Sequence, residues 1–189
     1  MPSIDDIPAP FGERVEQFLV LIGLERGLSN HTSEGYGNDL AACADFMEAM
    51  GVAEWSDMDA AHVSSWLVQM GKEGMAVSTV ARRFSALRAF IRFMVQERFL
   101  TEDATELLTG PTLRRKLPEV LTIQEMERLL AVPSPHEPRG IRDLAIIELF
   151  YSSGLRVSEL CGLTLNQLLL EDGVIRVFGK GSKERFVPL

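Results

Sequence analysis

The chain has 189 residues, is 46% hydrophobic and carries a formal net charge of -8. A chain of this length can bury a substantial core in one large or two small domains, and we expect two. Its longest apolar runs, such as residues 18–22, are too short to cross a bilayer, and the start of the chain is acidic where a secretory signal would be basic. We therefore expect a cytoplasmic protein that does not span a membrane.

The net charge by itself argues against a polyanionic partner, because nucleic-acid binding usually leaves a basic footprint. The charges are unevenly distributed, however, and residues 82–98 and 114–116 form two locally basic stretches. The two cysteines, Cys43 and Cys161, lie far apart in core-like patterns without the paired spacing of zinc or redox sites. We expect both to be buried thiols, and we expect no metal site.

Four amphipathic helices are predicted in the first half of the chain, at residues 12–27, from Ser29 or Asn30 to 51, at 58–71 with Asp57 opening it, and from Ser78-Thr79 to 98. Their inward positions recur at helical spacing: Val15, Phe18, Leu19, Ile22 and Leu24; Thr32, Tyr36, Leu40, Cys43 and Phe46; Val63, Trp66, Leu67 and Met70; Val80, Phe84, Leu87, Ile91 and Met94. This pattern predicts a helical bundle.

Four arginines accompany the apolar stripe of the last of these helices: Arg82, Arg83, Arg88 and Arg92. Arg82 and Arg83 stand near the helix start, where both can hold phosphate oxygens. Read from this helix alone, the arginines can equally form a solvated basic face whose side-chain stems cover the core.

Residues 109–118 read as an interdomain linker, because they contain Gly110-Pro111 and the basic cluster Arg114, Arg115 and Lys116 without any sustained period. The domains are then 1–108 and 119–189. In the second domain, Thr122 and Glu125 have the spacing of a capping box at a helix start. Residues 140–151 form an almost wholly apolar helix that we expect at the domain centre, and residues 174–178 and 185–189 read as two strands of a hairpin.

The most unusual residue is Arg156, which directly follows a glycine turn at the start of a helix patterned by Leu155, Leu160 and Leu163. On such a buried scaffold its guanidinium needs an acidic partner, carbonyl groups or a bound anion, and Glu159 stands one turn later. Lys180 lies in the turn of the predicted hairpin. Two cations on separate elements suit an anionic transition state, although Arg156 can instead pair only with Glu159, and Lys180 can be a solvated charge.

Residues 154–163, followed by residues 179–189, resemble the tyrosine site-specific recombinases of the phage integrase family, in particular the Xer type. The resemblance covers nearly the whole chain. Residues 28–32 leading to Tyr36 and Asp39-Leu40, together with residues 78–88, resemble the family's N-terminal core-binding domain. Leu117-Pro118 with Leu121-Thr122 resembles the entry to its catalytic domain.

The resemblance implies a mainly α fold with a small β-hairpin: a SAM-like helical core-binding domain and the first part of an α+β catalytic domain. It implies a two-domain clamp around double-stranded DNA and strand cleavage through a 3'-phosphotyrosyl intermediate, without metal or other cofactor. In that scheme Arg156 grips the scissile phosphate, Lys180 protonates the leaving 5'-oxygen and Glu159 orients Arg156. The expected DNA-binding residues are basic: Arg82, Arg83, Arg88, Arg92, Arg114, Arg115 and Lys116.

In this family a second arginine in a His-x-x-Arg motif, a further His or Trp and the nucleophilic tyrosine all follow the lysine hairpin. We therefore expect the natural protein to continue past Leu189, and this chain to bind DNA without cleaving it. Residues 136–139 spell His-x-x-Arg, but they precede Arg156 in a proline-bearing loop and we attribute the match to coincidence. Neither Tyr36 nor Tyr151 is expected to be the nucleophile.

Xer-type members resolve chromosome dimers, generally as tetramers on two duplexes, so the resemblance also implies a paired recombinase as partner. Two alternatives remain open on the residues alone. The chain can be a truncated, non-catalytic relative that binds DNA, or a helical protein-interaction domain with no role on DNA.

Overall fold

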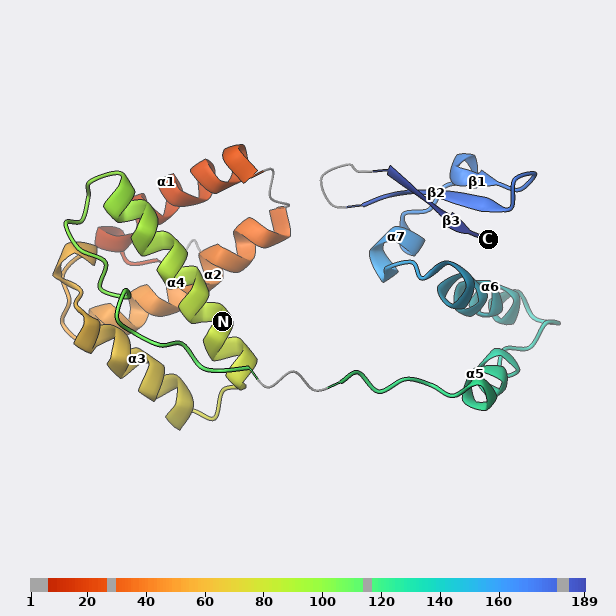
Figure 1. Cartoon of the computed structure of the whole chain (residues 1–189), viewed down its shortest axis with the longest axis horizontal. Coiled ribbons are helices and arrows are strands. Elements are labelled where there is room, and N and C mark those ends of the chain that lie inside the picture. Colours follow the sequence, from red (N-terminus) through yellow and green to blue (C-terminus); the bar gives the residue numbers. More distant parts are fainter. Residues whose placement is uncertain (1–6, 27–29, 114–116, 180–183) are drawn as a thin grey trace. The chain divides into compact units, whose positions relative to one another are not determined.

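The computed structural model describes residues 7–26, 30–113, 117–179 and 184–189, and the chain forms two compact units, residues 1–115 and 116–189 (Figure 1). The first unit contains α1 (Ala9–Arg26), α2 (Asn30–Ala49), a short 3-10 helix (Trp55–Asp57), α3 (Ala60–Lys72) and α4 (Val77–Gln96). The second contains α5 (Ile123–Leu130), α6 (Pro138–Ser153), α7 (Val157–Cys161), a short 3-10 helix (Leu165–Gln167), β1 (Leu168–Leu169), β2 (Val174–Phe178) and β3 (Glu184–Pro188).

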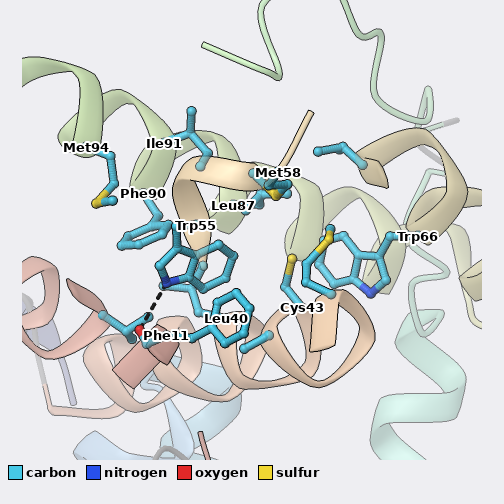
Figure 2. Close-up of a cluster of buried hydrophobic side chains, with 14 of the residues drawn as sticks. Phe11, Leu40, Cys43, Trp55, Met58, Trp66, Leu87, Phe90, Ile91 and Met94 are labelled. Carbon is cyan, nitrogen blue, oxygen red and sulfur yellow. Dashed lines mark hydrogen bonds between the residues drawn. The ribbon is translucent and has the colours of Figure 1, made fainter. Parts of the chain in front are cut away.

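The core of the first unit is built on the apolar stripe of α4, as the sequence predicted. The five stripe residues, Val80, Phe84, Leu87, Ile91 and Met94, are all buried and pack against α1, α2 and α3. The ring centres of Trp55 and Phe90 lie 4.9 Å apart. The Trp55 indole Nε1 donates a hydrogen bond of 3.0 Å to the carbonyl of Phe11 (Figure 2). Burial of the large indole therefore leaves its one polar atom satisfied.

Several boundary predictions in the first unit were wrong. Asp57 ends a 3-10 helix, and Asp59 caps α3 by accepting a 2.9 Å hydrogen bond from the backbone nitrogen of His62. Helix α4 begins at Val77 without a side-chain cap from Ser78 or Thr79. Leu24 is largely exposed, because it does not share the face of α1 that carries Val15, Phe18 and Ile22.

The segment after α4 folds back onto that helix. The Arg88 Nη2 donates to the carbonyl oxygens of Thr105, at 3.2 Å, and Leu108, at 2.5 Å. A Cβ at Gly110 would lie 2.7 Å from the Phe84 ring, so this backbone approaches α4 as closely as only glycine permits. Gly110, assigned to the linker by sequence, is thus packed on the first unit.

The sheet of the second unit has the order β1-β2-β3 and is antiparallel throughout, with Ile175 opposite Val187 and Val177 opposite Arg185. The predicted hairpin strands are confirmed, and β1 is an addition that the sequence did not predict. Alternation places Ile175 and Val177 on the buried face, where they pack with Leu155 into a small second core.

Two burial predictions in the second unit were wrong. Helix α6 was expected at the centre of its domain, but its apolar residues are half-buried or, like Ile141 and Tyr151, exposed. Within α6 only Gly140 and Ser153 are buried. Cys161 is exposed, because it lies on the outer side of α7. Cys43 is buried as predicted, and its burial raises the pKa of the thiol.

No helix in the described ranges combines the length and apolar character needed to cross a membrane. Across the same ranges, His, Cys, Asp and Glu side chains do not gather into any group of three or more that could hold a metal ion.

Two leucines allow a matched test of the first core. Leu40 is fully buried and Leu24 is largely exposed. Leu40→Ala is expected to lower the free energy of unfolding by about 2–5 kcal/mol, through lost burial and the cavity left behind. Leu24→Ala should stay within about 0.5 kcal/mol of wild type. Both tryptophans, Trp55 and Trp66, lie in the first unit, so urea denaturation followed by tryptophan fluorescence reports on this core. Equal effects of the two substitutions would contradict the packing described.

Candidate functional site

Arg156 is placed by a left-handed glycine. Gly154 ends α6 with φ 58° and ψ 33°, and its N–H donates to the carbonyl of Phe150 at 3.1 Å. A non-glycine residue adopts this conformation only with strain, so the glycine is what turns the chain sharply out of α6. Leu155 is then buried in the second core, and Arg156 stands directly before α7. The predicted glycine turn is therefore confirmed.

The Glu159 carboxylate accepts four hydrogen bonds. Its Oε2 accepts from the Arg156 backbone N–H at 2.8 Å, and its Oε1 accepts from the Arg156 Nη1 at 2.9 Å. Arg185 on β3 donates to both oxygens at once, Nη1 to Oε1 and Nη2 to Oε2, each at 2.8 Å. Such two-pronged guanidinium–carboxylate pairing is both strong and directional. Glu159 thus holds Arg156 as predicted, and it also ties Arg156 to the sheet.

These contacts determine the protonation state of Glu159. Hydrogen bonds from the Arg185 side chain, followed by the one from the Arg156 backbone, lower the pKa of Glu159 to about 2. The same pairing raises the pKa of Arg185 above its ordinary value. Glu159 is consequently ionised throughout the physiological range, and the cluster of Arg156, Glu159 and Arg185 carries a net charge of +1.

The burial predicted for Arg156 was wrong. Its side chain is 71% exposed, whereas that of Glu159 is only 9% exposed. The carboxylate is therefore the more covered member of the pair, with Arg185 of β3 lying against it, and most of the guanidinium faces solvent. An arginine held through one nitrogen and otherwise open is suited to binding an anion. Four other predicted site residues, Lys180, Arg114, Arg115 and Lys116, lie outside the described residues.

The arginines of α4 divide into two classes. Arg83 is 13% exposed, and its Nη1 contacts the sulfur atoms of Met70, at 3.9 Å, and Met75, at 3.4 Å. The Arg88 guanidinium donates hydrogen bonds to two carbonyls of the following segment. It also lies over the Phe84 ring, 4.5 Å from the ring centre. Arg83 and Arg88 thus already have partners within the fold.

Arg82 and Arg92 are exposed, the former with 57% of its side chain accessible. Together with Ser78, Ser85 and Gln96 they form an exposed stripe along α4, which we call the α4 stripe. One Arg82 nitrogen pairs with Asp39 of α2. Asp39 is buried, and this burial raises its pKa although Arg82 and Arg83 act in the opposite direction.

Sequence reasoning did not identify Asp39 as the partner of Arg82 or Arg185 as a partner of Glu159. Arg185 had a readable signal: on a strand, residues two apart share a face, so Arg185 points to the same side as Val187, which packs against the second core. An arginine on the core side of a strand requires a carboxylate or carbonyl partner. The signal for Asp39 was weaker, since only the packing of α2 against α4 brings it to Arg82.

Two sequence families match this chain. Residues 15–98 match the phage integrase N-terminal SAM-like domain, and residues 119–189 match the phage integrase family. The chain belongs to the phage integrase family of tyrosine recombinases. The SAM-like match lies within the first structural unit, and the second match begins just after the start of the second unit and includes Gly154, Arg156 and Glu159.

Curated relatives are of the Xer type. The chain is 40% identical over 175 residues to tyrosine recombinase XerD of Proteus mirabilis, covering 93% of this chain and 56% of that protein. It is 37% identical over 190 residues to tyrosine recombinase XerC of Vibrio vulnificus strain YJ016, covering 100% of this chain and 60% of that protein. The chain therefore spans somewhat more than half the length of these relatives.

Solved structures share the fold at low sequence identity. A lambda integrase (75-356) dimer bound to a COC' core site has a TM-score of 0.72 at 17% identity, covering 93% of this chain and 60% of that chain. XerH site-specific recombinase bound to a difH substrate has a TM-score of 0.62 at 22% identity, covering 93% and 52%. The mainly α fold with a small sheet, and the SAM-like first unit, are thus as predicted.

The lowered pKa of Glu159 predicts a pH dependence. A carboxyl whose pKa is about 2 when folded, against an ordinary value of 4.5, adds stability above pH 4.5 and loses it as the pH falls toward 2. Glu159→Gln should remove this contribution, so its stability deficit relative to wild type should shrink in that window. Hydrogen exchange of the β2 and β3 amides measures the free energy of unfolding of the second unit. Deficits that do not change between pH 6 and pH 2.5 would contradict the ionised cluster.

Proposed function

We propose that this chain is the DNA-gripping portion of an Xer-type site-specific recombinase. The observation that carries the proposal is the exposed Arg156 guanidinium, held on one side by the largely covered Glu159 carboxylate in a cluster of net charge +1. Arg156 is the residue that corresponds to the first catalytic arginine of the family. Its geometry suits a phosphate, because the planar guanidinium can present its remaining N–H groups to two phosphate oxygens.

In the proposed chemistry, Arg156 binds the scissile phosphate and stabilises the charge that develops on it during strand cleavage. Lys180 then protonates the leaving 5'-oxygen, since a lysine of ordinary pKa, about 10.4, is charged at neutral pH. The attacking group is a tyrosine hydroxyl, which in this family follows the lysine hairpin. The bond from phosphorus to the 5'-oxygen breaks as the 3'-phosphotyrosyl bond forms, so the energy of the phosphodiester is conserved. The reaction therefore requires no ATP, and in the proposed scheme Arg156 and Lys180 supply the charge stabilisation and the proton without a metal ion.

We assign duplex binding in the first unit to the α4 stripe, with Arg82 and Arg92 as its phosphate contacts. Arg83 and Arg88 support this surface from within, because their guanidinium groups are bound to methionine sulfurs and to carbonyls. The linker residues Arg114, Arg115 and Lys116 are proposed as further phosphate contacts on the basis of their charge. An overall charge of -8 is compatible with this assignment, because contact with DNA depends on local charge.

The assembly proposed is a tetramer on two duplexes, formed with a paired recombinase. Solved relatives in fold include a lambda integrase tetramer bound to a Holliday junction. The biological role proposed is the resolution of chromosome dimers in the cytoplasm, as for Xer-type proteins.

DNA binding through the α4 stripe predicts a salt dependence. Arg82→Gln and Arg92→Gln should each weaken duplex binding and reduce the slope of log K against log salt by about 0.9, the contribution of one phosphate contact. Arg98→Gln, the same change in the turn after α4, should leave the slope near wild type. Fluorescence anisotropy with a labelled duplex between 50 and 300 mM salt provides the measurement. A DNA-binding constant that does not change with salt concentration would overturn the proposal.

We expect these 189 residues to form no covalent DNA adduct. Tyr36 packs against the Phe18 ring in the first unit, at 5.7 Å between ring centres. Tyr151 lies on α6, ahead of Arg156 in sequence, where the family's nucleophile follows the lysine hairpin. Incubation with a nicked suicide duplex and denaturing electrophoresis decides the point. A tyrosine-linked band lost in Tyr151→Phe would show that this chain cleaves DNA by itself.

A further inference from the structure

We propose that Arg185 is a positioning residue for Arg156: by clamping Glu159 from β3, it fixes the Arg156 guanidinium and keeps its positive charge available to a phosphate. This inference rests on the proposed function, because it concerns the same phosphate site. Arg185 lies 29 positions beyond Arg156 in sequence and reaches the site only through the fold.

The geometry assigns the stronger hold on Glu159 to Arg185. Arg185 approaches the carboxylate with two nitrogens, both at 2.8 Å, whereas the Arg156 side chain uses a single nitrogen at 2.9 Å. The Arg185 side chain is also the less exposed of the two, at 34%. With both carboxylate oxygens fixed from the sheet, the orientation in which Glu159 accepts from Arg156 is set as well.

The charges lead to the same conclusion. A carboxylate paired with Arg156 alone would leave a cluster of net charge zero, in which the carboxylate repels an incoming phosphate. Arg185 offsets that carboxylate and restores a net charge of +1. Glu159 can therefore hold Arg156 in place without neutralising its attraction for an anion. Lysine would supply the charge but not the planar fork that engages both oxygens.

Strand pairing explains how Arg185 reaches Glu159. Arg185 lies opposite Val177 in the β2–β3 register, and Val177 is buried on the side of the sheet that carries the second core. Leu160, the residue after Glu159 on α7, packs against the same core. Arg185 comes five positions after Lys180 in sequence. Strand β3, whose Arg185 binds Glu159, therefore follows directly after the segment that contains Lys180.

The test compares Arg185→Gln and Arg185→Lys with Arg142→Gln in the full 189-residue chain. Arg142 is an exposed arginine of the second unit that pairs with its neighbour Asp143. Two quantities are measured without DNA. One is the pKa of Glu159, from its carboxyl carbon signal in NMR. The other is the affinity of Arg156 for inorganic phosphate, from its guanidinium nitrogen signal.

In Arg185→Gln, the Glu159 pKa should rise from about 2 toward its ordinary 4.5, and phosphate affinity at Arg156 should fall about tenfold. Arg185→Lys should keep more of the affinity, because it retains the charge, yet raise the Glu159 pKa. Arg142→Gln should change neither. In an Arg156→Gln background, Arg185→Gln should have little further effect on phosphate binding, since the two residues act as a unit.

Wild-type phosphate affinity and an unchanged Glu159 pKa in a folded Arg185→Gln or Arg185→Lys protein would overturn the inference. If Arg185→Gln does not fold, Arg185→Lys decides. A loss of phosphate binding that is equally large without Arg156 would also overturn it, because Arg185 would then be a direct anion contact. Failure of the proposed function has a different signature: the chain would not bind duplex DNA in the salt titration, while the DNA-free measurements still responded to Arg185.

Discussion

The second unit depends on one largely covered carboxylate, that of Glu159, whose side chain is 9% exposed. Glu159 accepts hydrogen bonds from the backbone and side chain of Arg156 and from both prongs of Arg185, and so joins the start of α7 to the last strand of the sheet. A lone buried carboxylate would be costly, but one with two guanidinium partners stays ionised. Because the Glu159 side chain is largely covered and the Arg156 side chain is exposed, Arg156 remains open to the phosphate contact proposed for it.

The first unit follows a similar division between internal and external charges. Arg83 and Arg88 bind sulfur atoms and carbonyls next to the core, and they fix the segments that flank α4. Arg82 and Arg92 lie on the outer side of the same helix and remain exposed. A single helix therefore provides the apolar stripe of the core, the clamps for its neighbours and an outward basic stripe. A count of basic residues along α4 does not separate these roles, because neighbouring arginines face different surroundings.

Much of this organisation was predictable from sequence. The apolar stripe of α4, the Thr122–Glu125 capping box, the glycine turn before Arg156 and the hairpin strands all have local signals, and all are confirmed. Burial was harder to predict, because it depends on which elements meet. Cys161 and the apolar residues of α6 have core-like patterns but lie at or near the surface, and Arg156 proved exposed while its partner was covered. The Arg185–Glu159 pair could not be predicted from spacing alone, since it requires the sheet to pack against α7.

The proposed function requires that Arg156 contacts one particular phosphate of the target DNA. The contact is tested by a thermodynamic cycle that combines substitution of Arg156 with neutralisation of single phosphates and measures DNA affinity. The duplex used is one recovered by selection from random sequence. Each backbone position in turn is replaced by a neutral methylphosphonate, and binding by wild type and by Arg156→Gln is compared. We expect one phosphate position in each half-site at which neutralisation weakens DNA binding by wild type but hardly affects binding by Arg156→Gln, since that variant has already lost the contact. If the two proteins lose affinity equally at every position, Arg156 does not grip a phosphate and the account is wrong.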